Sequence, residues 1–138
     1  MALTADRAAF LNGFVNRPWA KDGLHCWAFV SEVERVLFGR SLPLFAVMPE
    51  LREVARLFRD HDERRNWREV AAPADGSIVL MSRVADRRRS DLHCGVFLVT
   101  DGPGQIWHCD EPQGVEAVSP VEVTELRRWS LRYYEPAT

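Results

Sequence analysis

The sequence lacks several features that would place it in a specialised class of protein. No uncharged apolar run approaches the roughly 18 residues that suggest a membrane-spanning helix. The three cysteines are far apart and form no CxxC pair, which excludes a zinc ribbon or a thioredoxin motif. Neither charge dominates, because 18 Lys and Arg residues stand against 20 Asp and Glu residues. Without a strongly basic surface, we do not expect the chain to bind nucleic acid.

What is present fits one globular domain, residues 1–138. A chain of 138 residues that is 46% hydrophobic can bury about two-thirds of its unfolded surface. It therefore needs neither disulfides nor a structural metal to form a core. The N-terminal segment carries Asp6 and Arg7 and has no apolar core region. We expect no secretory signal peptide, and synthesis in the cytoplasm.

The first half of the chain has helical spacing and the second half has the pattern of strands. Apolar residues three and four positions apart predict helices over 5–15 and 26–38, and Pro49 opens another over 49–58. The charged segment 60–68 is expected to be a solvated loop. Strands are expected at 77–82, 93–100, 105–109, 114–118 and 129–134, with a short helix opened by the Ser119–Glu122 capping box. Helices followed by a mostly antiparallel sheet predict an α+β fold.

Cys26 lies where a loop ends and an amphipathic helix begins. The positive end of the helix dipole and the backbone N–H groups at that point stabilise a thiolate. We therefore expect the pKa of this thiol to be lowered. A thiolate next to an imidazole is a nucleophile for acyl transfer. The alternative is a buried, inert cysteine, because free cysteine is among the most buried residue types.

His93 starts one predicted strand and His108 lies near the end of the next. If the hairpin turns at Asp101–Gly104, residues in register have numbers that sum to about 205, and these two sum to 201. Both histidines should therefore lie near the same open end of the hairpin. One imidazole could act as a base and the other could orient it, as in a catalytic triad. A structural role for each histidine is the alternative.

Each cysteine directly follows a histidine in the chain. Side chains alternate between the two faces of a strand, so Cys94 and Cys109 are expected to face away from the site as small apolar fillers. Cys26, His93 and His108 could ligate zinc together with a water, but no closely spaced pair of ligands anchors such a site. We therefore expect no metal and no other cofactor.

Around these residues the chain resembles the NlpC/P60 cell-wall peptidases, in particular the short type found in phage tails, prophages and gene transfer agents. The resemblance covers residues 17 to 134. It is carried by Arg17-Pro18-Trp19, Gly23, Cys26-Trp27, Phe29-Val30, Phe38-Gly39 and Leu42-Pro43, then by His93 and Gly95, and then by Trp107-His108 with Gly114-Val115.

The resemblance implies a papain-like fold, with N-terminal helices packed on a small antiparallel sheet, and a cysteine hydrolase without a metal. Cys26 would attack a peptide carbonyl, His93 would be the general base, and His108 would orient His93. The implied substrate is the peptide stem of bacterial peptidoglycan, commonly at the bond between D-glutamate and the diamino acid. The implied setting is a phage tail or prophage, with tail proteins as partners.

The chain departs from the family pattern at His25, which replaces the usual Asp before the nucleophile. A cationic His25 would favour the thiolate, and loss of the aspartate cap could loosen the start of the helix. Two other kinds of function stay open. One is a non-catalytic tail-assembly or tail-tip protein that retains the fold, and the other is an amidase toxin delivered to a rival cell.

Residues near the three site positions are candidates for substrate contacts. Trp19 lies in the loop before Cys26 and could line a groove, and His25 adjoins the nucleophile. Arg83 and Arg89 belong to an arginine-rich segment before His93, where guanidinium groups could bind the carboxylates of an acidic peptide. The alternative for these arginines is a solvated loop.

Overall fold

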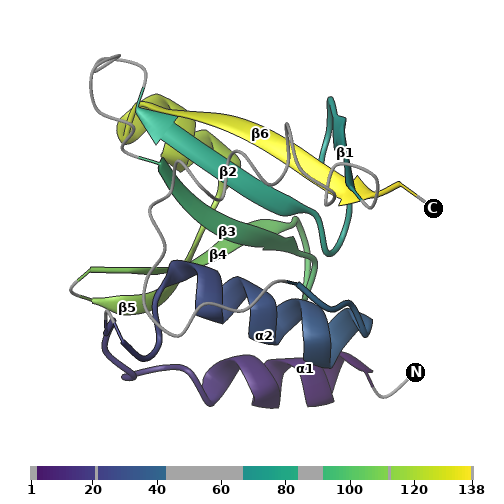
Figure 1. Cartoon of the computed structure of the whole chain (residues 1–138), viewed down its shortest axis with the longest axis vertical. Helices are drawn as coiled ribbons and strands as arrows, with labels where there is room; N and C mark the ends of the chain where they lie inside the picture. The colour runs from purple at the N-terminus through teal and green to yellow at the C-terminus, as the bar shows by residue number, and fades with distance from the viewer. Residues whose placement is uncertain (1–2, 21, 43–66, 84–91, 112, 138) are drawn as a thin grey trace.

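The computed structural model describes residues 3–20, 22–42, 67–83, 92–111 and 113–137, and it has the expected α+β class (Figure 1). Two helices come first and lie together on one side of a six-stranded antiparallel sheet. In chain order the elements are α1 (Leu3–Asn12), α2 (Cys26–Phe38), β1 (Trp67–Val70), β2 (Ile78–Arg83), β3 (Leu92–Leu98), β4 (Gln105–Asp110), β5 (Gly114–Val118), the short π-helix η2 (Glu122–Leu126) and β6 (Trp129–Pro136).

Most of the expected elements are present, and one strand was missed. The helix over 26–38 and the strand over 114–118 have the predicted bounds, and the other strands differ by one or two residues at their ends. The expectation that the charged segment 60–68 is solvated was wrong at Trp67, which is buried and begins β1, and residues 60–66 lie outside the described residues. The helix predicted at 49–58 lies outside the described residues.

The sheet order is β1-β6-β2-β3-β4-β5. The last strand of the chain is therefore inserted between the first two, and β2 and β3 occupy the centre. The β3–β4 hairpin pairs Gly95 with His108, a register two residues away from the one predicted from the turn. His93 and His108 still project near one another, because they come from adjacent strands at the same end of this hairpin.

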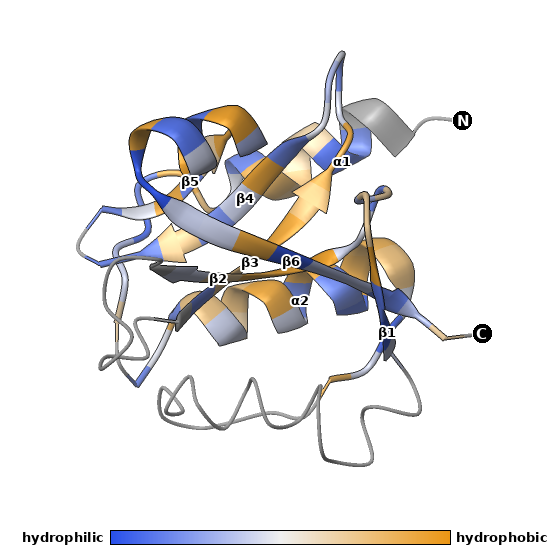
Figure 2. Ribbon diagram, turned by 90° about the horizontal axis from the view of Figure 1, so that it is seen from above, coloured by the Kyte–Doolittle hydropathy of each residue, from blue (hydrophilic) through white to orange (hydrophobic). Residues whose placement is uncertain are grey.

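Helix α2 has an amphipathic sequence and a defined stop. Its apolar residues Phe29, Val30 and Val33 are fully buried against the sheet, and apolar and polar residues alternate along its ribbon in Figure 2. At the C-terminal end Gly39 adopts a left-handed conformation, with φ of 67°, and its N–H donates to the carbonyl of Arg35. This is the usual glycine stop of a helix.

The core lies on both faces of the sheet. Two buried clusters fill the space between the helices and the sheet, with contributions from α2, β2 and β3. A third cluster, which includes Met81, Ile106 and Val123, lies on the opposite face beneath η2. The sheet is thus covered on both sides near β3 and β4, where the two histidines sit. No helix in the described part of the chain is long and apolar enough to cross a membrane.

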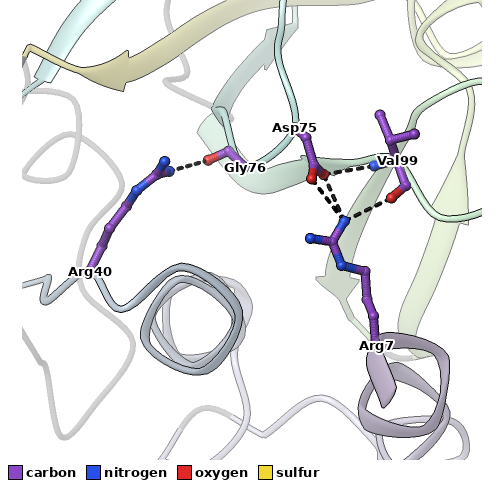
Figure 3. A network of polar contacts seen from close by, with 5 residues as sticks. All are labelled: Arg7, Arg40, Asp75, Gly76 and Val99. Carbon is purple, nitrogen blue, oxygen red and sulfur yellow. Dashed lines mark hydrogen bonds and ion pairs between the residues drawn. The ribbon is translucent and has the colours of Figure 1, made fainter. Parts of the chain in front are cut away.

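Polar contacts tie both helices to the turn before β2 (Figure 3). Asp75 accepts hydrogen bonds from the guanidinium of Arg7 on α1 and from the backbone N–H of Val99, each at 2.9 Å. Arg40 follows α2 and donates to the carbonyl of Gly76 at 3.1 Å. The same guanidinium lies 3.0 Å from the carboxylate of Glu34. These contacts fix the end of α2 opposite to Cys26.

Glu34 on α2 should make stability fall with rising pH. Its side chain is fully buried, and burial raises the pKa of Glu34 to about 7 although Arg40 opposes this. A raised folded-state pKa penalises ionisation, so stability is lost between the unfolded pKa of about 4.5 and about 7. The free energy of unfolding of Glu34→Gln, relative to that of wild type, should therefore increase by about 2–3 kcal/mol between pH 4 and pH 8.

Urea unfolding at both pH values measures this difference. Glu32→Gln removes an exposed carboxylate from the same helix and is the matched control, with an expected change below about 0.5 kcal/mol. A Glu34→Gln variant whose advantage does not grow with pH would contradict the assignment.

Candidate active site

The first turn of α2 positions Cys26, and His25 caps that turn. His25 has an extended backbone, and its Nδ1 accepts a hydrogen bond from the N–H of Ala28 at 3.2 Å. This satisfies one of the backbone donors that every helix start leaves open. The histidine therefore does the capping that an aspartate would do at this position. Only 1% of the surface of His25 is exposed, and a substrate-binding role for this residue stays a prediction.

The thiol of Cys26 is stabilised as a thiolate. A hydrogen bond from Cys94 lowers the pKa of Cys26 most, burial raises it, and a hydrogen bond with His93 and the charge of His93 lower it further, so that it ends well below its usual value. Burial and the nearby Cys26 raise the pKa of Cys94, which keeps Cys94 as the donor. The expected lowered pKa is present, and its largest cause is a second thiol that the sequence analysis did not place here.

Cys94 therefore corrects one expectation. It does face the helix side of the sheet, opposite to His93, as strand alternation requires. The nucleophile candidate lies on that same side, however, because Cys26 and Cys94 belong to one buried cluster with Trp27 and Val30. Cys94 is thus a contact of the site and not a remote filler. Cys109 is buried in the neighbouring cluster, where its thiol donates to the carbonyl of Leu24 at 3.5 Å.

His93 and His108 form a directly hydrogen-bonded pair. Nε2 of His93 lies 2.7 Å from Nδ1 of His108, and the rings meet edge to face at an angle of 82°. Both side chains are buried, with 8% and 3% of their surfaces exposed. Since His93 also hydrogen-bonds Cys26, the three residues form a continuous chain from the thiol to the second imidazole.

The pKa values of the two histidines are shifted in opposite directions. Burial lowers the pKa of His93, but the hydrogen bond with Cys26 and the charge of Cys26 raise it overall. Burial and the charge of His93 lower the pKa of His108 to about 4. These shifts act together, because the lowered pKa of Cys26 and the raised pKa of His93 both favour the ion pair over the neutral pair, while the lowered pKa of His108 favours its neutral ring.

The polar chain continues beyond His108 to β5 and η2. Nε2 of His108 lies 3.0 Å from a carboxylate oxygen of Glu116. Glu116 in turn accepts a hydrogen bond of 2.6 Å from Arg127. The sequence analysis missed both residues. The predicted strands 105–109 and 114–118 leave a turn at 110–113, whose register places residue 115 opposite His108, whereas the structure pairs His108 with Glu116. A slip of one residue moves a side chain to the other face of a strand, so these bounds did not identify Glu116.

One cluster among the described residues could ligate a metal. It consists of His93, His108 and Asp110, whose ligand atoms lie within 4.8 Å of one another, whereas the sequence suggested Cys26 as the third ligand. Two nitrogens on a tetrahedral zinc at 2.0–2.1 Å would be about 3.3 Å apart. The histidine nitrogens are 2.7 Å apart and share a proton. These two nitrogens are therefore spaced as a hydrogen-bonded pair, closer together than two ligands of one zinc.

Two hollows lie near these residues. A small cavity of about 10 Å³ borders His93, His108 and Asp110 on the η2 side of the sheet, which is at most the space of one water molecule. A wider, open hollow of about 510 Å³ lies where α1 ends and α2 begins, lined by Phe14, Leu24 and Glu32 among others. Leu24 is two residues from Cys26, so this hollow adjoins the segment that leads to the thiol.

The remaining sequence candidates are not brought to the thiol by any described contact. Trp19 is half-buried and packs against the cluster that includes Phe29 and Val33. Arg83 is the last residue of β2, where it pairs with Trp129. Arg89 lies outside the described residues. Substrate-binding roles for Trp19, Arg83 and Arg89 stay predictions.

Comparison with known proteins does not assign this chain to a family. No protein-family model matches the chain, and no curated protein is significantly similar to it. The functional conclusion therefore rests on the residues of the site.

Proposed function

We propose that this chain is a cysteine hydrolase of the NlpC/P60 type, with a papain-like fold, that cleaves a peptide bond in the stem of bacterial peptidoglycan. The single observation that carries the proposal is the polar chain from Cys26 through His93 to His108. A nucleophile, a base within hydrogen-bond reach and a third group that orients the base are the parts that such chemistry needs. The substrate class comes from the sequence resemblance, and so does the setting in a phage tail or prophage.

The reaction would proceed in two steps. The thiolate of Cys26 attacks the carbonyl carbon of the amide, and the C–N bond breaks as the imidazolium of His93 donates its proton to the leaving amine. This leaves a thioester on Cys26 and a neutral His93. A water then gives one proton to His93 while its oxygen attacks the thioester carbon. The C–S bond breaks, which restores the thiolate–imidazolium pair and releases a carboxylic acid that gives its proton to the solvent.

Peptidoglycan fragments test the proposal directly. The full chain, kept reduced, is incubated with a muropeptide that contains the D-glutamate–diamino acid bond, and the products are read by mass spectrometry. We expect two fragments whose masses sum to that of the substrate plus one water. A stem truncated before the diamino acid lacks this bond and should stay intact. An intact full-length stem at every pH tried would contradict the proposal.

One observation favours a second candidate, a non-catalytic tail protein that retains the fold. The side chain of Cys26 is 0% exposed and that of His93 is 8% exposed. A substrate carbonyl must reach the sulfur, so catalysis requires this end of α2 to open toward the substrate. The muropeptide assay separates the two candidates, because the tail protein would leave every stem uncut.

A further inference from the structure

Glu116 lies directly behind the second histidine of the site. Strands β4 and β5 are antiparallel, and their register places His108 opposite Glu116. Residues paired in this way point to the same face of a sheet. Nε2 of His108 is 3.0 Å from Oε1 of Glu116. The backbone pairing of the two strands therefore holds the carboxylate against the imidazole ring.

This contact decides which nitrogen of His108 carries the proton. Nε2 is buried and has no hydrogen-bond partner among the described residues, and the nearest carboxylate oxygen in an ion-pair contact is that of Glu116 at 3.0 Å. At 3.0 Å a lone pair on Nε2 would be repelled by the carboxylate oxygen, whereas an N–H dipole is attracted to it. Neutral His108 therefore carries its proton on Nε2, and its Nδ1 is left as an acceptor.

The tautomer of His108 then sets the role of His93. Because Nδ1 of His108 accepts, Nε2 of His93, 2.7 Å away, must donate. Neutral His93 is left with its lone pair on Nδ1, the ring nitrogen that does not contact His108. Because Nε2 is engaged with His108, we assign the hydrogen bond between His93 and Cys26 to Nδ1, which can take a proton from the thiol. The opposite tautomer of His108 would put the proton of neutral His93 on Nδ1 and remove the base.

Arg127 keeps Glu116 charged and in place. Its Nη1 donates to Oε1 of Glu116 at 2.6 Å, and its Nη2 lies 3.2 Å from Glu122. Burial raises the pKa of Glu116, but the hydrogen bond and the charge of Arg127 and the contact with His108 lower it overall. The carboxylate is therefore ionised at neutral pH, as the tautomer argument requires.

We propose that Glu116 is a positioning residue of this site, which fixes the tautomer of His108 and, through it, the orientation and proton of His93. The inference rests on the proposed hydrolase function. Among the described residues, the charged and titratable groups that face His108 are His93 on β3, Asp110 on β4, Glu116 on β5 and Arg127 after η2. The contact of Glu116 with Nε2 is the one that selects the tautomer.

Kinetics of three variants test the proposal. Glu116→Ala should lower kcat about tenfold or more, with KM within about twofold, since a charge-assisted contact to the catalytic chain is lost. Glu116→Gln keeps an acceptor oxygen and should lose less. In both variants the alkaline limb of the pH profile should move to lower pH, because the charge of Glu116 raises the pKa of His93. Glu122→Gln, which removes the other carboxylate on Arg127, should change neither kcat nor the profile.

A second measurement needs no substrate. Ring-nitrogen NMR of the full chain should show His108 with its proton on Nε2 in wild type and in Glu122→Gln, and a mixture of tautomers in Glu116→Ala. A proton on Nδ1 in wild type would overturn the proposal, as would a Glu116→Ala variant with the kcat and pH profile of Glu122→Gln. If wild type cleaves no muropeptide, the hydrolase function fails, and the NMR measurement alone decides the role of Glu116.

Discussion

Cys26→Ala is expected to abolish muropeptide cleavage, with a loss of at least about 1,000-fold in kcat. Alanine removes the sulfur and leaves His93 with no thiol to activate, so no thioester can form. The fold should survive, because removing one small buried side chain costs only about 1–2 kcal/mol. A colorimetric or mass-spectrometric assay of stem cleavage measures the loss, and circular dichroism confirms that the variant is folded.

Cys109→Ala is the matched control for this variant. Cys109 is another fully buried cysteine, but its thiol contacts the backbone carbonyl of Leu24 and not His93. We expect it to retain kcat within about threefold. A Cys26→Ala protein that cleaves as fast as Cys109→Ala would show that Cys26 is not the nucleophile.

The same pair of variants has a readout that needs no substrate. The hydrogen bond and the charge of Cys26 raise the pKa of His93 against the effect of burial. Cys26→Ala should therefore lower the pKa of His93 in an NMR titration, and Cys109→Ala should leave it close to the wild-type value. An unchanged His93 titration in Cys26→Ala would mean that the two side chains are not coupled.

Local elements of this fold could be predicted from the sequence, and long-range pairing could not. Helix α2 has apolar spacing and a glycine stop at Gly39, so its bounds follow from local signals, whereas the cap that His25 provides is visible only in the structure. Strand β1 is short and has charged residues at its centre, and it pairs with β6 at the other end of the chain. Nothing local in its four residues distinguishes that strand from a loop, because its stability comes from a distant partner.

The segment after Ser119 shows a different limit. Its capping box is formed, since the Ser119 hydroxyl accepts from the N–H of Glu122 at 3.1 Å. The helix nevertheless continues with π spacing, and the N–H of Arg127 donates to the carbonyl of Glu122. The hydroxyl of Thr124 donates to the carbonyl of Pro120, which an α-helix would pair with a backbone N–H. Such side-chain competition for a carbonyl perturbs a helix that propensity alone would predict as regular.

In the site, residue chemistry pointed to Cys26, His93 and His108, and geometry supplied their neighbours. Cys94 was not predicted as a site residue, because side chains alternate along a strand and the face opposite to His93 was assumed to be core only. Cys26 packs with Cys94 on the face of the sheet that the helices cover, and it also hydrogen-bonds His93, which points to the other face of β3. Residues from both faces of this strand therefore contact the sulfur. Glu116 was missed for a different reason. The predicted strands 105–109 and 114–118 place residue 115 opposite His108, because the first strand was ended one residue before its observed end at Asp110.

Gly114→Ala should be the most destabilising single substitution among the glycines of this sheet, at about 3–5 kcal/mol. Gly114 has φ of 93°, a conformation that side chains disfavour, and a Cβ built on it would lie 2.1 Å from the carbonyl oxygen of Arg17. The atoms that this Cβ would meet belong to the backbone of Arg17 and Pro18, so no flexible side chain can move aside. A loss of this size should lower Tm by about 10–15 °C in thermal unfolding followed by circular dichroism.

Gly102→Ala isolates the cause of that loss. Gly102 has nearly the same φ, 99°, but its added Cβ would meet nothing within 4 Å, so the substitution should cost only the backbone strain of about 1–2 kcal/mol. The difference between the two variants measures the close approach of β5 to Arg17, in the loop that leads to Cys26. Because this approach holds the loop against the sheet, Gly114→Ala should also lower muropeptide cleavage at a temperature where it is still folded, and Gly102→Ala should not. Equal losses of stability in both variants would mean that the loop shifts freely and that Gly114 is needed for its backbone conformation alone.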